Sequence, residues 1–198
     1  DKIIEIGAVK VKNGKIIDSF SEFVNPRRPI PYKITELTGI SDDMVRYSDS
    51  IDFVLPRFMD FIGDAAVVAH NASFDCSFIE KNCKDLDLHF NATILDTVQI
   101  CRFLYPELKS VKLNLVAKHL GVKLTSHHRA VDDAAATAQI FIKFLEMLEK
   151  KGAKKLSDVN EVLGGIDYTK LKTKHITLIA QNLAGIKNLY KIVSDAHV

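Results

Sequence analysis

Two short polar clusters contain the residue types that hydrolysis of a phosphodiester bond requires. They are Ala-His-Asn-Ala-Ser-Phe-Asp at residues 69–75 and His-His-Arg-Ala-Val-Asp-Asp at residues 127–133. Carboxylate oxygens are preferred ligands of hard cations such as Mg²⁺, and two such cations can activate a water and stabilise the leaving oxygen. A neutral histidine can take the proton from that water. The clusters therefore suit Asp75 and Asp133 as metal ligands and His128 as general base.

Each cluster also has a purely structural interpretation. The first follows an apolar run and opens a helix, so Asn71 and Ser73 would cap that helix. In the second, acidic residues near a helix N-terminus are favoured by the helix dipole whatever their chemistry. The pair His127-His128 has no further His or Cys at ligand spacing, which argues against a structural zinc site. Taken one at a time, the clusters leave the structural interpretations open.

The elements that must position these residues predict an α/β domain. Residues 3–11 and 16–24 read as strands on either side of Asn13-Gly14, which is a strong hairpin signal. Short strands are predicted at 65–69 and 93–95, and helices at 32–37, after Ser41, and at 51–62, 73–84, 96–104, 113–120 and 130–151. A hairpin followed by alternating strands and helices indicates a mixed sheet flanked by helices.

Composition is that of a soluble globular protein. The chain has 198 residues, 47% of them hydrophobic and 26% charged, which suits one domain with a small appendage. A net charge of +2 is too mild to indicate nucleic-acid binding, so local basic residues or metal ions would have to supply positive charge. Three cysteines without C-x-x-C spacing favour a cytoplasmic location. No apolar run predicts a membrane span or a signal peptide.

Taken together, the two clusters resemble motifs of a known family. His-Asn-x-x-Phe-Asp followed by His-x-x-x-x-Asp is similar to the second and third motifs of the DEDDh (DnaQ-like) exonucleases, which have an RNase H-like fold. Segments at residues 1–9, 25–26, 37–40, 95–97 and 113–115 match the family in the same order. The resemblance covers residues 1–150, so we expect that range to form the exonuclease domain.

The resemblance implies a role for each matched residue. Asp75 and Asp133 would be metal ligands, with two Mg²⁺ or Mn²⁺ ions in the intact domain, and His128 would be the general base. The substrate-binding residues would be His70, Asn71 and Phe74. The five-residue step from His128 selects Asp133 over the neighbouring Asp132, and His127 is one residue out of register.

The first motif of the family, Asp-x-Glu-Thr-Thr-Gly, belongs on a central strand just upstream of the position of Asp1. Asp1 and Glu5 cannot replace it, because their spacing is wrong and Glu5 falls in the following strand. The family pattern has four acidic ligands and this sequence shows two. We therefore expect the sequence to be a fragment of a longer chain, and expect the chain as it stands to bind two metal ions weakly or not at all and to be impaired.

After residue 150 the sequence changes character. Residues 151–174 read as a linker with a short helix near 157–163, and a strand and a helix are predicted within 175–198. The segments at 175–182 and 185–194 resemble the PHP domain of PolC-type replicative DNA polymerases, in which an exonuclease is inserted. This resemblance implies a proofreading 3′→5′ exonuclease that acts on single-stranded or frayed DNA 3′-ends, with PHP and polymerase domains in the same parent chain.

Three other interpretations remain. The last residues would fit an ordinary C-terminal strand and helix of the same domain. An RNase T-like or oligoribonuclease-like enzyme would have the same fold and would trim RNA. A non-catalytic scaffold domain would explain the missing first motif, although Asp75, His128 and Asp133 argue against this for the parent protein.

Overall fold

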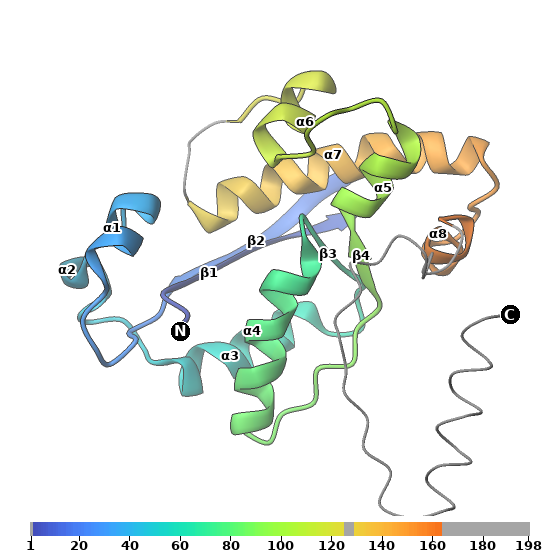
Figure 1. Ribbon diagram of the computed structural model, residues 1–198. Coiled ribbons are helices and arrows are strands. Elements are labelled where there is room, and N and C mark those ends of the chain that lie inside the picture. Colours follow the sequence, from blue (N-terminus) through green and yellow to red (C-terminus); the bar gives the residue numbers. More distant parts are fainter. Residues whose placement is uncertain (1, 125–128, 164–198) are drawn as a thin grey trace, which may run out of the picture. The chain divides into compact units, whose positions relative to one another are not determined.

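The computed structural model describes residues 2–124 and 129–163 (Figure 1). Its elements are β1 (Glu5–Lys12), β2 (Lys15–Phe23), α1 (Tyr32–Thr38), α2 (Asp42–Val45), α3 (Ile51–Ile62), β3 (Val67–Ala69), α4 (Ala72–Asp85), β4 (Ile94–Asp96), α5 (Thr97–Leu104), α6 (Leu113–His119), α7 (Ala130–Lys150) and α8 (Leu156–Val162). Every helix and strand predicted within the described residues is present, and the boundaries differ by at most two residues.

β1 and β2 form the hairpin that the Asn13-Gly14 signal predicts. They pair antiparallel, from Glu5 opposite Phe23 to Lys12 opposite Lys15. Asn13 and Gly14 have φ of 51° and 70°, which are the left-handed values required at both central positions of a type I′ turn. The turn sets the register at its own end of the hairpin, and a one-residue shift between Lys10 and Val11 then places Glu5 opposite Phe23.

The described strands make two sheets of two strands each. β3 and β4 are parallel, with Ala69 beside Asp96 at their carboxyl ends. Within residues 2–124 and 129–163 no hydrogen-bonded ladder joins β1 to β3. The antiparallel and the parallel pairing expected of a mixed sheet are therefore both present, but in two different sheets. The carboxyl ends of β3 and β4 bring the first polar cluster beside the start of α5.

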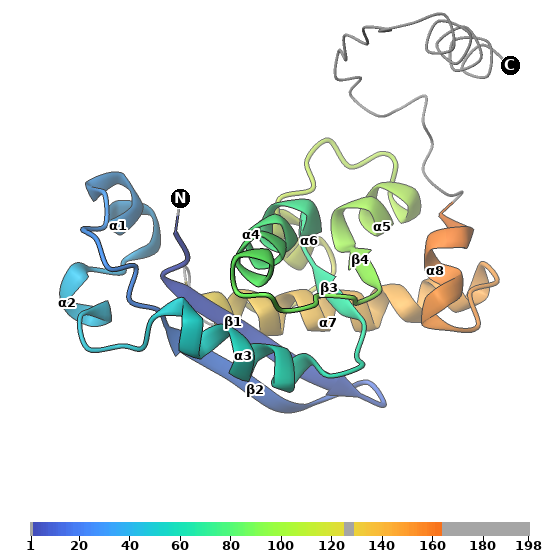
Figure 2. The same cartoon turned by 90° about the horizontal axis from the view of Figure 1, so that it is seen from below.

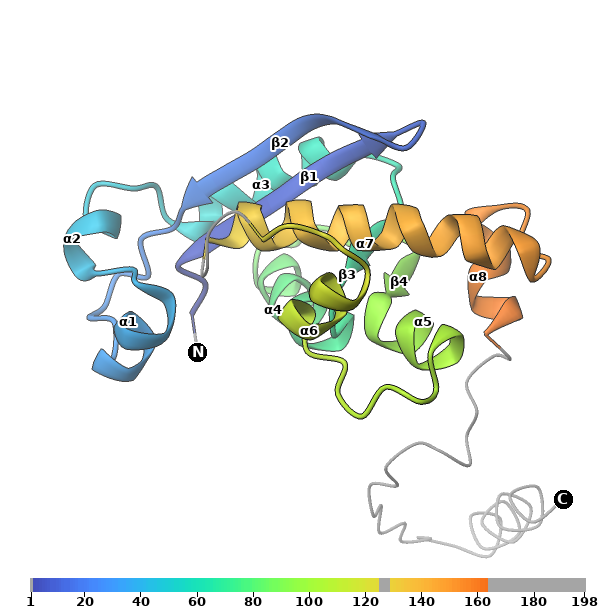
Figure 3. The same ribbon diagram turned by 90° about the horizontal axis from the view of Figure 1, so that it is seen from above.

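Helices cover the hairpin on both faces. Figure 1 shows α7 above β1 and β2, with α3 below them; Figures 2 and 3 give the same layers from below and from above. α7 contacts β1, β2 and β3, so it packs on strands of both sheets. None of the helices in the described part of the chain is long and apolar enough to cross a membrane. Because α7 packs on β1 and β2, its first turn is held against the hairpin.

Two apolar clusters fill the space between these layers. One includes the fully buried Ile100, Ile140 and Phe144 and lies among α5, α6 and α7. The other includes the buried Phe20 and Leu55 and lies between the hairpin, α3 and α4. The two clusters hold α4 and α7, the helices that carry the predicted site residues, in one body.

The short helix predicted within the linker is α8. Val159 in α8 and Ala153 before it are buried in the same cluster as Leu148 of α7. Residues 151–163, predicted as the first part of the linker, therefore pack with the domain. The strand and helix predicted within 175–198 lie outside the described residues.

Candidate active site

The first polar cluster forms the junction between β3 and α4. Asn71 precedes α4 in a left-handed conformation, with φ of 69° and ψ of 53°. Asp75 lies in the first turn of α4 and is exposed at the surface. Phe74 is 61% exposed, and its ring packs edge-on against that of Phe78, with 5.3 Å between ring centroids. Phe74 and Asp75 are thus presented to solvent at the start of a helix.

Asp96 holds this junction in place. Its Oδ1 atom accepts hydrogen bonds from the amide of Val98 at 2.8 Å and from the amide of Asn71 at 3.0 Å. The first bond caps α5, and the second fixes the residue that precedes α4. One carboxylate oxygen therefore ties the end of β3 to the start of α5.

His70 links three segments through both of its ring nitrogens. Nε2 lies 2.7 Å from the carbonyl oxygen of Val111, which can only accept, so Nε2 carries a hydrogen. Burial lowers the pKa of His70 and favours the neutral ring. Nδ1 of the neutral ring can then only accept from the hydroxyl of Thr97, 2.8 Å away, and it shares that hydroxyl with the carbonyl oxygen of Ala69 at 3.2 Å. A substrate that hydrogen-bonded to His70 would have to replace one of these two bonds.

The surroundings of Asp75 raise the pKa of its carboxyl group. Desolvation by surrounding protein atoms raises the pKa of this carboxyl, and the negative charge of Asp96 raises it further, although Asp75 remains partly open to solvent. A hydrogen bond with its own backbone acts in the opposite direction. A cation beside Asp75 would relieve both unfavourable effects.

The second polar cluster leads into α7. Asp133 is half-buried in the first turn of α7, and its amide donates to the carbonyl of Arg129 at 3.1 Å. His128 lies outside the described residues. Asp75 and Asp133 therefore each lie in the first turn of a helix, on α4 and α7.

Glu5, at the start of β1, binds the N-terminus of α7. Its carboxylate accepts from Nε of Arg129 at 2.8 Å and from the amide of Ala130 at 3.0 Å. Only 5% of the Glu5 side chain is exposed, so both bonds are shielded from water. The Arg129 guanidinium also lies 4.8 Å from the ring centre of Phe23, the cross-strand partner of Glu5. These contacts fasten the hairpin to the segment that carries Asp133.

The side chains of the two clusters are of the types that bind divalent cations. Mg²⁺ and Mn²⁺ prefer carboxylate oxygens, and Asp75 and Asp133 would supply them. Among residues 2–124 and 129–163 no group of three or more His, Cys, Asp and Glu side chains is arranged to hold a metal ion. Asp75 and Asp133 lie in the first turns of α4 and α7 and remain the predicted metal ligands.

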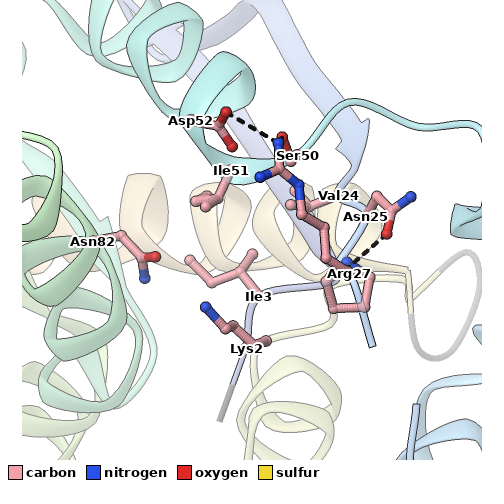
Figure 4. A pocket seen from close by; sticks show the side chains of 10 residues that line it. Lys2, Ile3, Val24, Asn25, Arg27, Ser50, Ile51, Asp52 and Asn82 are labelled. Carbon is pink, nitrogen blue, oxygen red and sulfur yellow. Dashed lines mark hydrogen bonds and ion pairs between the residues drawn. The ribbon is translucent and has the colours of Figure 1, made fainter. Parts of the chain in front are cut away.

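A cavity of about 110 Å³ lies away from the predicted residues (Figure 4). Its wall includes Lys2, Ile3, Val24, Asn25, Arg27, Ser50, Ile51, Asp52 and Asn82. The Arg27 guanidinium is bound to Ser50 at 2.7 Å and to Asp52 at 3.2 Å. None of the predicted catalytic or substrate-binding residues lines this cavity, so it does not mark the predicted site.

Sequence reasoning did not assign roles to Glu5, Asp96 and Thr97. Glu5 carries a recognisable signal, because a charged residue within the apolar run Ile3-Ile4-Glu5-Ile6 predicts a buried partner. Asp96 caps α5 locally, but its contact with Asn71 and that of Thr97 with His70 join residues more than twenty positions apart. Those contacts could not be inferred from local spacing.

Solved structures share this arrangement. Exonuclease X, solved in complex with 5′ overhanging duplex DNA, is 26% identical with a TM-score of 0.65, over 82% of this chain and 91% of that one. The nuclease domain of 3′hExo, a DEDDh family member, is 20% identical with a TM-score of 0.62, over 74% of this chain and 82% of that one. The fold is therefore the α/β, RNase H-like fold of the DEDDh exonucleases, as predicted.

Sequence comparison gives the family. The profile described as "Exonuclease" matches residues 1–141, and the chain belongs to the exonuclease family. The chain is 56% identical to the PolC-type DNA polymerase III of Clostridium perfringens over 200 residues and 43% identical to that of Bacillus subtilis over 202. Both alignments span the whole of this chain, which covers 14% of the length of these relatives.

Proposed function

We propose that this chain is the 3′→5′ proofreading exonuclease region of a PolC-type replicative DNA polymerase. The observation that carries the proposal is its 56% identity, over the whole chain, to a PolC-type DNA polymerase III. The alignment continues through residues 164–198, beyond the "Exonuclease" profile. A free-standing RNA-trimming enzyme would not account for that continuation.

The catalytic roles follow from the chemistry of the two clusters. Asp75 and Asp133 would hold divalent cations, Mg²⁺ or Mn²⁺, which would supply activation of a water and stabilisation of the leaving oxygen. His128 takes the proton of the attacking water. The pKa of Asp75, raised by desolvation and by Asp96, supports its assignment as a residue that works beside a cation.

The remaining acidic ligands come from an Asp-x-Glu motif upstream of Asp1. We place that motif on a strand between β1 and β3. Within the described residues each of these strands is paired along one edge only, so each has an edge available for pairing. A strand in this position would join the two sheets into one mixed sheet.

The substrate is the 3′-end of DNA, single-stranded or frayed. Exonuclease X, a relative with the same fold, has been solved bound to DNA. The exposed ring of Phe74 offers a stacking surface for a base, and the exposed Asn71 lies three residues before it. His70 would position this junction through Thr97 and Val111 as well as lying beside the substrate.

Partners and location follow from the polymerase assignment. PHP and polymerase domains of the same parent chain lie beside the exonuclease, and the protein works in the cytoplasm without a membrane. We propose that residues 175–198 belong to the PHP domain. The exonuclease domain itself extends through α8, because Val159 is fully buried in its core.

The test uses the full-length protein that carries this sequence. We expect it to release mononucleotides from a 3′-labelled single-stranded DNA with Mg²⁺ or Mn²⁺, faster than from an RNA of the same sequence. Asp133→Ala should abolish this release, and Asp132→Ala, its neighbour on the same helical turn, is the matched control. His128→Ala should lower the rate by about 10²–10⁴. A normal nuclease rate in Asp133→Ala would refute the site, and preference for RNA would refute the substrate.

A further inference from the structure

A carboxylate from a strand of the hairpin, that of Glu5, satisfies the N-terminus of α7. Arg129 precedes α7 at the N-cap position and makes no side-chain cap hydrogen bond. The amide of Ala130, the first residue of α7, is instead satisfied by the carboxylate of Glu5 from β1. The first amides of a helix have no partner within the helix, so this bond satisfies a group that would otherwise need another acceptor.

The negative charge of Glu5 strengthens its hydrogen bonds to Arg129 and Ala130. A buried carboxylate is unfavourable unless it is paired and hydrogen-bonded. Glu5 receives both forms of stabilisation, from the Arg129 guanidinium and from the positive end of the α7 dipole. Removing its charge would therefore leave two part-buried donors, Nε of Arg129 and the amide of Ala130, with a weaker acceptor.

Backbone packing at Gly7 shows how closely β1 approaches α7. A Cβ atom at Gly7 would lie 2.2 Å from the backbone nitrogen of Val131 and 2.3 Å from the carbonyl carbon of Ala130. Glu5 and Gly7 are two residues apart on one strand, so they face the same side. The carboxylate and the bare glycine together fit the first turn of α7, in which Asp133 lies.

We propose that Glu5 is a positioning residue for Asp133, which it holds through Arg129 and Ala130 without touching the cation or the substrate. This inference rests on the proposed function for the role of Asp133. The path is short: Glu5 fixes Arg129, and the Arg129 carbonyl accepts from the amide of Asp133. Loss of Glu5 would let the first turn of α7 shift on the hairpin and displace the Asp133 carboxylate.

The test compares Glu5→Gln with Glu22→Gln in the full-length protein. Glu22 lies on β2, opposite Ile6, and is bound by Arg57 on α3, away from α7. Its substitution therefore removes a similar carboxylate–arginine contact from the other face of the same hairpin. Four quantities are measured for each variant: kcat and KM on single-stranded DNA, Mn²⁺ binding by calorimetry, and amide hydrogen exchange at residues 130–133.

For Glu5→Gln we expect kcat to fall by roughly 10- to 100-fold, because a small misplacement of a catalytic group has a cost of this size. KM should change less than about twofold, since substrate contacts are not altered. Mn²⁺ binding should weaken and amide exchange at 130–133 should quicken. Glu22→Gln should match the wild type in all of these.

Equal behaviour of the two variants in exchange, Mn²⁺ binding and kcat would overturn the inference. Should Glu5→Gln fail to fold, Arg129→Met provides the same comparison, because it removes one partner of Glu5 and keeps the bond to Ala130. A wild-type protein without nuclease activity would instead overturn the proposed function. Exchange and calorimetry would still decide, independently of activity, whether Glu5 fixes the turn that carries Asp133.

Discussion

The carboxylate of Asp96 accepts the amide hydrogen of Asn71 at 3.0 Å, across the parallel pair β3 and β4. The same oxygen accepts the amide of Val98 and caps α5. One side chain thereby fixes the backbone just before α4, four residues ahead of Asp75. The geometry of the first polar cluster depends on a residue outside that cluster.

Replacing Asp96 should destabilise the domain through this double contact. Asp96→Ala should lower the free energy of unfolding by about 1–2 kcal/mol, the upper range for loss of a helix cap, because a second bond is lost with it. Denaturant titration measures the change. Ser41→Ala is the control, since Ser41 stands at the N-cap of α2 and makes no side-chain cap hydrogen bond. Equal losses for the two variants would contradict the assigned role of Asp96.

Two substitutions of Asn71 distinguish the effect of its left-handed backbone on stability from the effect of its side chain on DNA binding. At its φ of 69°, alanine is disfavoured by roughly 1–2 kcal/mol whereas glycine is not. Asn71→Gly should therefore nearly preserve the unfolding free energy and Asn71→Ala should lower it by about 1 kcal/mol. Both should raise KM for DNA if the side chain binds the terminal nucleotide. Identical stabilities would show that the left-handed conformation does not limit this position.

The lowered pKa of His70 should make the stability of the domain depend on pH. Burial lowers its pKa in the folded state, so the unfolded chain binds the proton more readily. The stability that His70 provides is thus present above its ordinary pKa of about 6.5 and is lost as the pH falls toward the lower folded value.

Thermal unfolding between about pH 7.5 and pH 5.5 measures this effect. We expect the wild type to lose more stability over this range than His70→Gln does. His89→Gln, which removes a histidine from an exposed segment after α4, is the control and should behave like the wild type. A steeper dependence in His70→Gln would mean that the sign of the shift is wrong.

Local sequence signals predicted nearly all of the described elements. Asn13-Gly14 determines a type I′ turn, and Gly39 ends α1 in a left-handed conformation with φ of 70°. Helical spacing gave the bounds of α3 without error despite Pro56 within it. These features depend on residues within a few positions of one another, so the sequence alone carries them.

Contacts between distant segments could not be predicted in this way. Glu5 and Arg129 are 124 residues apart, and nothing in either local pattern names the other. His70 was predicted to bind substrate from its motif, yet its ring nitrogens are used by Thr97 and Val111. Motif matching identified which residues to examine, whereas the side-chain partners of those residues depend on how the sheets and helices pack.

Asp75 gives the most direct test of the metal site. Its pKa is raised by desolvation and by the charge of Asp96, so the ionised form is unfavourable in the folded state. A group with a raised folded pKa contributes stability at low pH that is lost as the pH rises through that value. At neutral pH without metal, Asp75→Asn should therefore raise the thermal midpoint of unfolding, because the amide carries no charge.

In the full-length protein, added Mn²⁺ should make the wild type more stable than Asp75→Asn. A cation that binds the folded state stabilises it by mass action, and the wild type should gain more than Asp75→Asn. Glu80→Gln, on the exposed surface of the same helix, is the control and should respond to Mn²⁺ like the wild type. A lower midpoint for Asp75→Asn in chelator, together with an undiminished response to Mn²⁺, would remove Asp75 from the metal site.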